Sequence, residues 1–245
     1  MAGDNVGNAG ILAVTKREYV RATRALRTGL TSLHLLSPQP PSPERRVRHW
    51  LYSLLYIHDS DGLISLDVPW WTYPAIGTVE DWIAQHEGPV RVFEYGSGAS
   101  TVWLSKRAAE VHSVEHHEGF ASIMADRLRT LDNVDLAVVP GVPSANPKTP
   151  SHKEGAHGLD FTDYVNAIER PGGRFDLIVI DGRAREACLA AAVDYLQPDG
   201  LVVYDNSWRR RYRRAIAASP LKARRFRGIA PSLPYPDETS LLSVG

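Results

Sequence analysis

The chain has 245 residues, 43% hydrophobic and 23% charged, and is therefore long enough to bury a core. Lysine plus arginine and aspartate plus glutamate each number 28, so no overall field favours nucleic acid or an anionic membrane. The one cysteine, Cys188, excludes an intrachain disulfide, and no apolar run reaches the roughly 18 residues of a membrane span.

For residues 1–65 we expect a flexible N-terminus followed by a helical extension. The chain starts without the basic and apolar segments of a signal peptide, so we expect a soluble, cytoplasmic protein. Apolar residues recur at helical spacing over residues 17–36, and the proline-rich segment 37–43 ends that helix. Ser42 and Pro43 predict the start of a second helix. The apolar stripe of this second helix would comprise Val47, Trp50, Leu51, Leu54 and Leu55.

Residues 66–245 predict one α/β domain with a doubly wound, Rossmann-like sheet. A helix opens at Pro74 and closes near Gly88, and short β-branched runs then alternate with helical segments, which is typical of a parallel sheet. Residues 141–160 lack periodicity and are long for a connection, so they are either a lid or an inert insertion. The strand runs are 90–95, 110–115, 134–139, 175–180 and 200–205, and two runs near 223–228 and 239–244 would form a closing hairpin.

The stretch FEYGSGASTVW, residues 93–103, is the first candidate binding site. In a doubly wound sheet a ligand binds beyond the carboxyl ends of the strands, where this turn would lie. Gly96 and Gly98 fit the start of a dinucleotide-binding motif, but Thr101 stands where the third glycine would be. This departure argues against NAD.

Two acids indicate a different ligand. Glu115 ends the strand after the glycine turn and suits the two hydroxyls of an adenosine ribose, while Glu94 could orient a ligand ammonium group directly or through water. S-adenosylmethionine contains a ribose and an amino acid but no phosphate, so it matches the groups that these two acids would bind. The candidate cofactor-binding residues are Glu94, Gly96, Ser97, Gly98, Ser100, Glu115 and Asp181.

Five segments carry a family resemblance: PWWTYPAI, EYGSGAST-W, SVEH, VIDGRAREAC and YDNS, in that order. They resemble class I S-adenosylmethionine-dependent methyltransferases, and more closely a group of bacterial methyltransferase-like proteins. The resemblance covers roughly residues 66–245. It implies a seven-stranded sheet with a reversed last strand and a methyl-transfer activity.

Asp181, Asp205 and Asn206 follow two strands that we expect to be neighbours, so their side chains would meet at one edge of the sheet. Such hard oxygen donors suit Mg²⁺. The arrangement resembles the metal site of catechol O-methyltransferase-like enzymes, which implies a possible Mg²⁺ that lowers the pKa of an acceptor hydroxyl. The same residues could instead form a turn and a helix N-cap, or contact the methionine ammonium without metal. Where those enzymes carry a lysine, this chain has Ala184.

The candidate catalytic residues are Asp181, Arg183 and Tyr73. Arg183 flanks Ala184, although an arginine stays protonated and is a poor general base. Tyr73 belongs to an aromatic segment with Trp70 and Trp71, which would either wall a substrate pocket or pack in the core.

We expect O-methylation of a small molecule, such as a natural product or a sugar hydroxyl. One alternative is an RNA or protein methyltransferase that uses the basic segment 208–227. Another is a non-catalytic module that keeps the methyltransferase fold. The neutral net charge argues against nucleic acid, no membrane partner is expected, and a homo-oligomer stays open.

Overall fold

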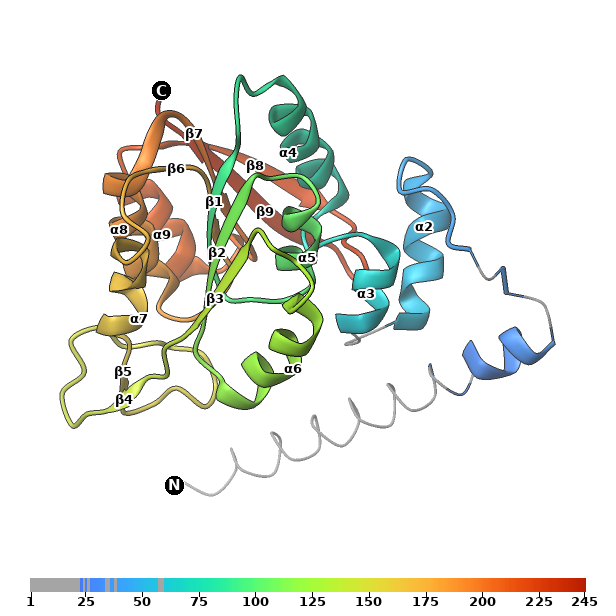
Figure 1. The fold of residues 1–245 in the computed structure, drawn as a ribbon, viewed down its shortest axis with the longest axis horizontal. Helices are drawn as coiled ribbons and strands as arrows, with labels where there is room; N and C mark the ends of the chain where they lie inside the picture. The colour runs from blue at the N-terminus through green and yellow to red at the C-terminus, as the bar shows by residue number, and fades with distance from the viewer. Residues whose placement is uncertain (1–22, 24, 26, 34–35, 38, 57–59) are drawn as a thin grey trace.

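The computed structural model describes residues 23–245 apart from 24, 26, 34–35, 38 and 57–59 (Figure 1). Its centre is a seven-stranded sheet in the order β3-β2-β1-β6-β7-β9-β8. Strand β9 runs antiparallel to both of its neighbours and the remaining pairs are parallel, so the predicted doubly wound sheet with a reversed last strand is confirmed. The strands are β1 (Arg91–Tyr95), β2 (Glu110–Glu115), β3 (Val134–Val138), β6 (Phe175–Ile180), β7 (Leu196–Tyr204), β8 (Lys222–Gly228) and β9 (Asp237–Ser243).

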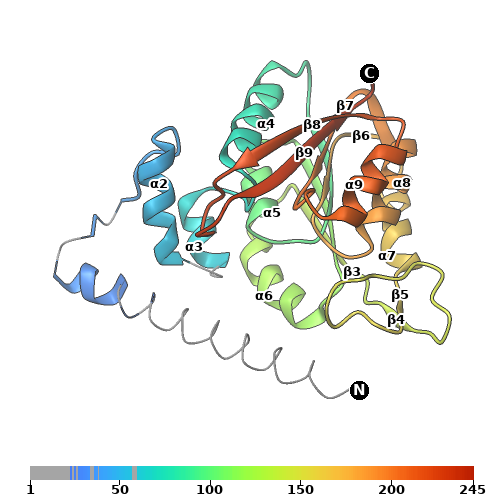
Figure 2. The same ribbon diagram turned by 180° about the vertical axis from the view of Figure 1, so that it is seen from behind.

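Helices cover both faces of the sheet (Figures 1 and 2). One face carries α4 (Tyr73–Gln85), α5 (Ala99–Ser105) and α6 (Glu118–Leu128), and the other carries α7 (Thr162–Asn166), the short η2 (Ala167–Glu169), α8 (Arg185–Tyr195) and α9 (Arg210–Ala218). The central strand β6 is fully buried from Leu177 to Ile180, as its continuous apolar run predicts for a strand covered on both faces. Within the described part of the chain, no helix is both long and apolar enough to cross a bilayer.

The N-terminal extension contains α2 (Arg46–Ser53), η1 (Leu54–Tyr56) and α3 (Ser60–Leu66). The predicted apolar stripe is wrong for Val47 and Leu51, which are 62% and 54% exposed, whereas its other members Trp50, Leu54 and Leu55 are half-buried. The buried residues are His49 and Ser53 instead. His49 Nδ1 lies 2.6 Å from the Tyr73 hydroxyl, and Ser53 Oγ accepts a hydrogen bond from a backbone amide near the C-terminus. Partners distant in sequence therefore decide which face of α2 is buried.

The start of α2 also differs from its prediction, since the helix begins at Arg46 and not at Pro43. Ser42 and Pro43 form a turn before it, in which the Arg45 amide donates to the Ser42 carbonyl at 2.9 Å. Of the helix predicted over 17–36, residues 27–32 are helical, and the part before residue 23 lies outside the described residues.

Residues 141–160 are more ordered than their sequence predicts. Strands β4 (Val142–Pro143) and β5 (Leu159–Asp160) pair antiparallel and close the segment into a loop, shown at the lower left of Figure 1. Ala156 packs into the core with 3% exposure, and the Asp160 carboxylate accepts the Thr162 amide at 2.8 Å. The loop is tied to the domain at both ends, and its role as a lid stays a prediction.

Candidate active site

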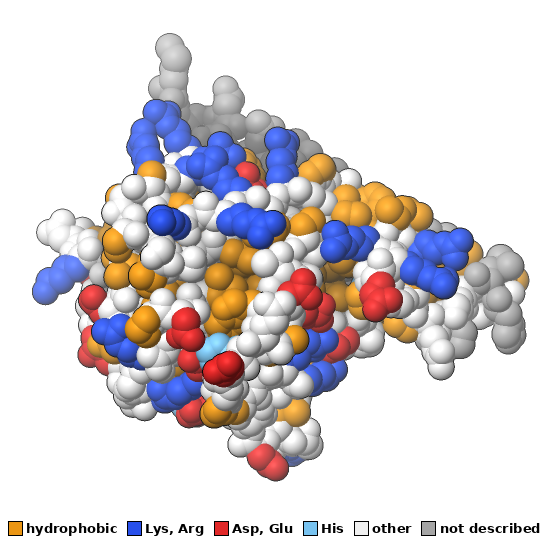
Figure 3. Space-filling view, turned by 90° about the horizontal axis from the view of Figure 1, so that it is seen from above, with side chains coloured by type: hydrophobic (Ala, Val, Ile, Leu, Met, Phe, Trp, Pro, Cys, Tyr) orange, Lys and Arg blue, Asp and Glu red, His pale blue; other side chains and the backbone are white. Residues whose placement is uncertain are grey.

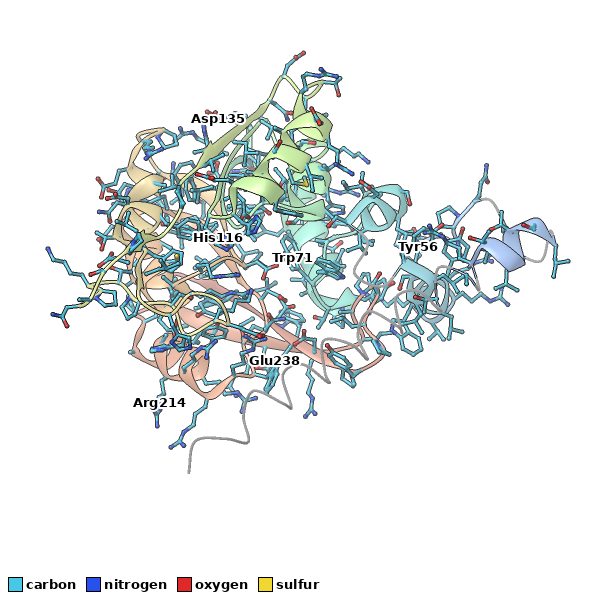
Figure 4. The ribbon with its side chains drawn as sticks, turned by 90° about the horizontal axis from the view of Figure 1, so that it is seen from below. Tyr56, Trp71, His116, Asp135, Arg214 and Glu238 are labelled. Carbon is cyan, nitrogen blue, oxygen red and sulfur yellow. The ribbon has the colours of Figure 1, made fainter. Side chains whose placement is uncertain are left out.

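A cavity of about 740 Å³ lies at the carboxyl ends of β1, β2, β6 and β7. This volume suits a cofactor-sized ligand. Figure 4 looks onto this side of the molecule, with His116 near the middle of the view. Nine of the predicted site residues line the cavity: Gly96, Ser97, Gly98, Ser100, Glu115, Asp181, Arg183, Asp205 and Asn206. Glu94 and Tyr73 do not.

The two glycines of the turn after β1 serve different purposes. Gly96 has a φ of +98°, and a Cβ there would lie 2.8 Å from Gly182 Cα, so no other residue fits without displacing the neighbouring turn. Gly98 has extended backbone, and a Cβ there would have no atom within 4 Å. Because Gly98 lines the cavity, the space beside it is open to a ligand.

These two positions give a matched pair of variants. We expect Gly96→Ala to lower the free energy of unfolding by about 2 kcal/mol, because it combines strained backbone with a clash. Gly98→Ala should leave this free energy unchanged within about 0.5 kcal/mol but weaken cofactor binding about tenfold, because its methyl group enters the cavity. Urea denaturation and calorimetric titration of both variants check this, and equal destabilisation by the two would contradict it.

Glu94 does not face the cavity, which corrects its predicted contact with the ligand. Its side chain is fully buried and accepts hydrogen bonds from Ser100 Oγ and Thr101 Oγ1 at 2.5 Å and from Ser113 Oγ at 2.8 Å. Thr101 Oγ1 also accepts the Gly98 amide at 2.9 Å. The residue in place of a third glycine thus ties Glu94 to the turn. Glu94 therefore stabilises the turn through Ser100 and Thr101, a role of Thr101 that the glycine motif does not indicate.

Glu115 is placed as a hydrogen-bond acceptor at the end of β2. Its Oε1 accepts the backbone amides of His116 and His117 at 2.9 and 2.8 Å, and His116 Nδ1 lies 2.6 Å away. Burial would raise the pKa of Glu115, but these contacts outweigh it and hold the pKa below its usual value. Among the residues that the structure describes, none donates to Oε2, so an ionised oxygen remains for a ligand.

Ser97 provides a second polar group without a partner. Its Oγ lies in the cavity wall, is buried, and has no hydrogen-bond partner within the described chain. Buried hydroxyl groups are seldom left unpaired in folded proteins. The pair of Ser97 Oγ and Glu115 Oε2 fits a polar ligand that spans the ends of β1 and β2.

Asp181, Asp205 and Asn206 come together at the ends of β6 and β7, but a buried arginine lies among them and donates to the side chains of Asp181 and Asn206 and to the backbone of Asp205. Arg185, 1% exposed, donates from Nη2 to the Asp181 carbonyl at 2.7 Å and also to its carboxylate oxygen Oδ1. Its Nη1 donates to the Asp205 carbonyl at 2.7 Å and to Asn206 Oδ1 at 3.3 Å. One guanidinium group therefore joins all three residues.

The rest of the donor set does not suit a metal either. Asp205 is 3% exposed and accepts a hydrogen bond from Thr239 Oγ1 at 3.0 Å. Burial, and next the charge of Asp181, raises the pKa of Asp205 well above its usual range, which favours a neutral carboxyl group. In the described residues, no group of three or more His, Cys, Asp or Glu side chains could hold a metal ion. These residues do not fit Mg²⁺, because a fixed positive charge lies among them.

Tyr73 is not part of the cavity wall, which corrects its predicted catalytic role. It is 3% exposed at the start of α4, and its hydroxyl lies against His49. Burial raises the pKa of this hydroxyl well above its usual value. Of the neighbouring tryptophans, Trp71 is fully buried against Trp103, as the core-packing alternative predicts, whereas Trp70 lines the cavity, and its contact with a substrate stays a prediction.

The basic segment 208–227 divides between two elements. Arg213 on α9 pairs with Glu238 at 3.2 Å, and Arg214 points away from the molecule in Figure 4. The exposed cations of β8 lie on the edge strand of the sheet, where charged side chains prevent pairing with another sheet. Basic and acidic side chains both appear on the face in Figure 3. The segment has a structural reason for its charge that needs no RNA.

No protein-family model matches the sequence, and no curated protein matches it. Among solved structures, the O-methyltransferase TomG from Streptomyces achromogenes, involved in tomaymycin synthesis and solved with S-adenosylmethionine, has a TM-score of 0.54 and 19% identity over 79% of this chain and 90% of that chain. An O-methyltransferase from Bacillus cereus, solved with S-adenosylhomocysteine, has a TM-score of 0.52 and 18% identity over 91% of each chain. An rRNA methylase from Streptococcus thermophilus has a TM-score of 0.50 and 12% identity over 69% of this chain and 96% of that chain. The sheet order and these similarities together show that the chain has the fold of S-adenosylmethionine-dependent methyltransferases.

Proposed function

We propose that the protein is an S-adenosylmethionine-dependent methyltransferase that methylates a hydroxyl group of a small molecule. The observation that carries the proposal is the end of the cavity at β1 and β2, where open space beside Gly98 adjoins two unpartnered polar atoms. The similarity to two O-methyltransferases, one solved with S-adenosylmethionine, supports the choice of cofactor and reaction.

The proposal assigns the cofactor to residues along this end of the cavity. Glu115 would accept hydrogen bonds from the ribose hydroxyls through Oε2, and Ser97 would bind the methionine part beside the glycine turn. Asp181 lines the cavity, and its carboxylate, held by Arg185 on one oxygen, would receive the methionine ammonium on the other. When bound, the cofactor would supply a sulfonium methyl group for in-line transfer to the acceptor oxygen; S-adenosylhomocysteine would leave and the hydroxyl proton would pass to solvent.

The chain would contribute mainly position and charge to this transfer. A correctly oriented acceptor gains much of its rate from proximity alone. Arg183 lines the cavity next to Asp181 and has no hydrogen bond from its side chain to any described residue. As a cation that does not release its proton, it would stabilise an acceptor oxyanion instead of removing the proton.

Calorimetric titration of S-adenosylhomocysteine, with NAD as a control ligand, tests the proposed cofactor. We expect the first to bind and the second not to bind. Glu115→Gln should weaken binding about tenfold or more, because it loses a charge-assisted hydrogen bond to the ribose. Glu118→Gln, an exposed position on α6, is the matched control and should change nothing.

Two results would contradict the proposal. Failure of both S-adenosylmethionine and S-adenosylhomocysteine to bind would exclude the methyltransferase function. Equal loss of affinity in Glu115→Gln and Glu118→Gln would remove Glu115 from the site. Binding without methyl transfer to any acceptor would favour the alternative of a non-catalytic module, and salt-sensitive binding of RNA would favour the RNA alternative.

A further inference from the structure

Four cationic side chains meet in the wall of the cavity: Lys153, Arg183, Arg185 and Arg209. They come from separate segments of the chain, namely the 141–160 loop, the turn after β6, helix α8 and the turn before α9. Lys153 was missed by the sequence analysis because no local pattern connects this loop to the strand ends. The pKa of Lys153 is lowered to about 8, first by burial and next by repulsion from Arg185; the charge of Asp181 opposes the shift, and Arg183 and Arg209 add smaller repulsions.

The acids of the cavity leave three of these cations without a direct partner. Asp181 is bound by Arg185, and the neutral form of Asp205 is favoured by burial. Asp237 accepts Asn206 Nδ2 at 2.9 Å and its neighbour's backbone amide at 2.7 Å. Glu115 accepts the backbone amides of His116 and His117, and its charge attracts Arg183 without a direct ion pair.

The three remaining cations are Lys153, Arg183 and Arg209. Within the described chain, none of them has an ion pair or a side-chain hydrogen bond to another residue. Arg209 has only loose contacts with the rings of Trp208 and Tyr212, 5.8 Å from its guanidinium carbon to each ring centroid. Three cations without ion-pair partners around one cavity repel one another, and an anion bound directly between them would relieve that repulsion.

The position of Arg209 separates it from the proposed cofactor site. Arg209 follows β7, and the sheet order β1-β6-β7 places it two strands away from the glycine turn. With neighbouring strands about 4.8 Å apart, this separation is roughly 10 Å. Trp208 and Tyr235, which are 54% and 57% exposed, line the same end and offer flat surfaces to an acceptor.

We propose that the methyl acceptor is an anion, a small molecule with a carboxylate or phosphate group that is bound by Lys153, Arg183 and Arg209. This inference rests on the proposed function only where it identifies the bound anion as the methyl acceptor. The anion site itself can be tested without the cofactor. Arginine and lysine form strong charge-assisted hydrogen bonds with both kinds of group.

Benzoate and phenyl phosphate serve as probes, with neutral benzyl alcohol as the control ligand. Each is titrated calorimetrically into the full chain, both free and saturated with S-adenosylhomocysteine. We expect both anions to bind and the alcohol not to bind. Stronger binding of benzoate would assign a carboxylated acceptor, and stronger binding of phenyl phosphate a phosphorylated one.

Arg209→Gln should weaken the binding of the anions about tenfold, the change that one lost charge-assisted hydrogen bond gives. Arg214→Gln, an exposed change on the helix α9 that follows Arg209, should leave it unchanged, because Arg214 points away from the molecule. The bound anion should also draw a proton onto Lys153 at pH 8, seen as a binding heat that depends on the buffer. Lys153→Met should abolish this proton uptake.

Three results would overturn the inference. The anions could fail to bind, they could bind Arg209→Gln and Arg214→Gln equally, or they could compete with S-adenosylhomocysteine. Competition would mean that the cations hold the cofactor's own carboxylate. Because S-adenosylhomocysteine binding is measured separately, failure of the anion site leaves the proposed function standing, and the reverse also holds.

Discussion

Arg185→Met is expected to lower the free energy of unfolding by about 3–5 kcal/mol, the cost of breaking a buried ion pair by removing one partner. Arg185 makes five hydrogen bonds, to the Asp181, Gly182 and Asp205 carbonyls and to the Asp181 and Asn206 side chains. Burial alone would lower the pKa of its guanidinium, but the charge of Asp181 more than compensates and raises it. Without this cation, Asp181 would lose its only ion-pair partner among the described residues.

Urea denaturation of the variant measures this loss directly. Arg185→Lys keeps the charge but not the planar fork, so we expect it to be destabilised less than Arg185→Met but more than the parent protein. Arg214→Met, an exposed change on α9, is the control and should stay within about 0.5 kcal/mol of the parent.

The same variant tests whether arginine stands where a metal would bind. Mg²⁺ should not change the stability of the parent protein, and EDTA should have no effect on its binding of S-adenosylhomocysteine. In Arg185→Met, the oxygens of Asp181 and Asn206 are released, so Mg²⁺ should restore part of the lost stability. A saturable stabilisation of the parent protein by Mg²⁺, reversed by EDTA, would contradict the assignment.

The strands of the sheet could be predicted well, because each strand is marked by a local run of apolar residues in the sequence. The run FDLIVI is apolar at every position except Asp176 and matches β6 residue for residue. Strand ends also determine which side chains share an edge, so Glu115, Asp181 and Asp205 were placed correctly from order alone. Binding sites at the ends of parallel strands can be predicted to this extent, because the topology brings their residues together.

The same reasoning failed where a contact depends on the folded backbone and not on the order of the strands. The resemblance to catechol O-methyltransferases points to a lysine three residues after Asp181, but the cation of this chain is four residues later, at Arg185. Ala184 adopts a left-handed conformation with φ of +46° directly before α8, which no pattern in the sequence indicates. Lys153 reaches the cavity only through the folding of a long loop. Each of these features depends on tertiary contacts.

Glu94 gives the second large effect, a loss of stability with rising pH that Glu94→Gln should remove. Burial is the main reason that the pKa of Glu94 is raised from 4.5 to about 7; the hydroxyls of Ser100, Thr101 and Ser113 oppose the shift, and the charge of Asp181 adds to it. In the unfolded chain the carboxyl group ionises near its usual pKa. Between these two values the folded protein therefore holds a proton that the unfolded chain has released.

The sign of the effect follows from this difference in bound protons. Below pH 4.5 both states are protonated and Glu94 contributes no pH dependence. As the pH rises from there to about 7, folding becomes less favourable, and the accumulated loss is about 3 kcal/mol. Urea denaturation at pH 5 and pH 8 should show the parent protein losing this stability relative to Glu94→Gln, with Glu118→Gln behaving like the parent. Parallel behaviour of the parent and Glu94→Gln would mean that the three hydroxyl donors outweigh burial and keep the carboxylate ionised beneath the glycine turn.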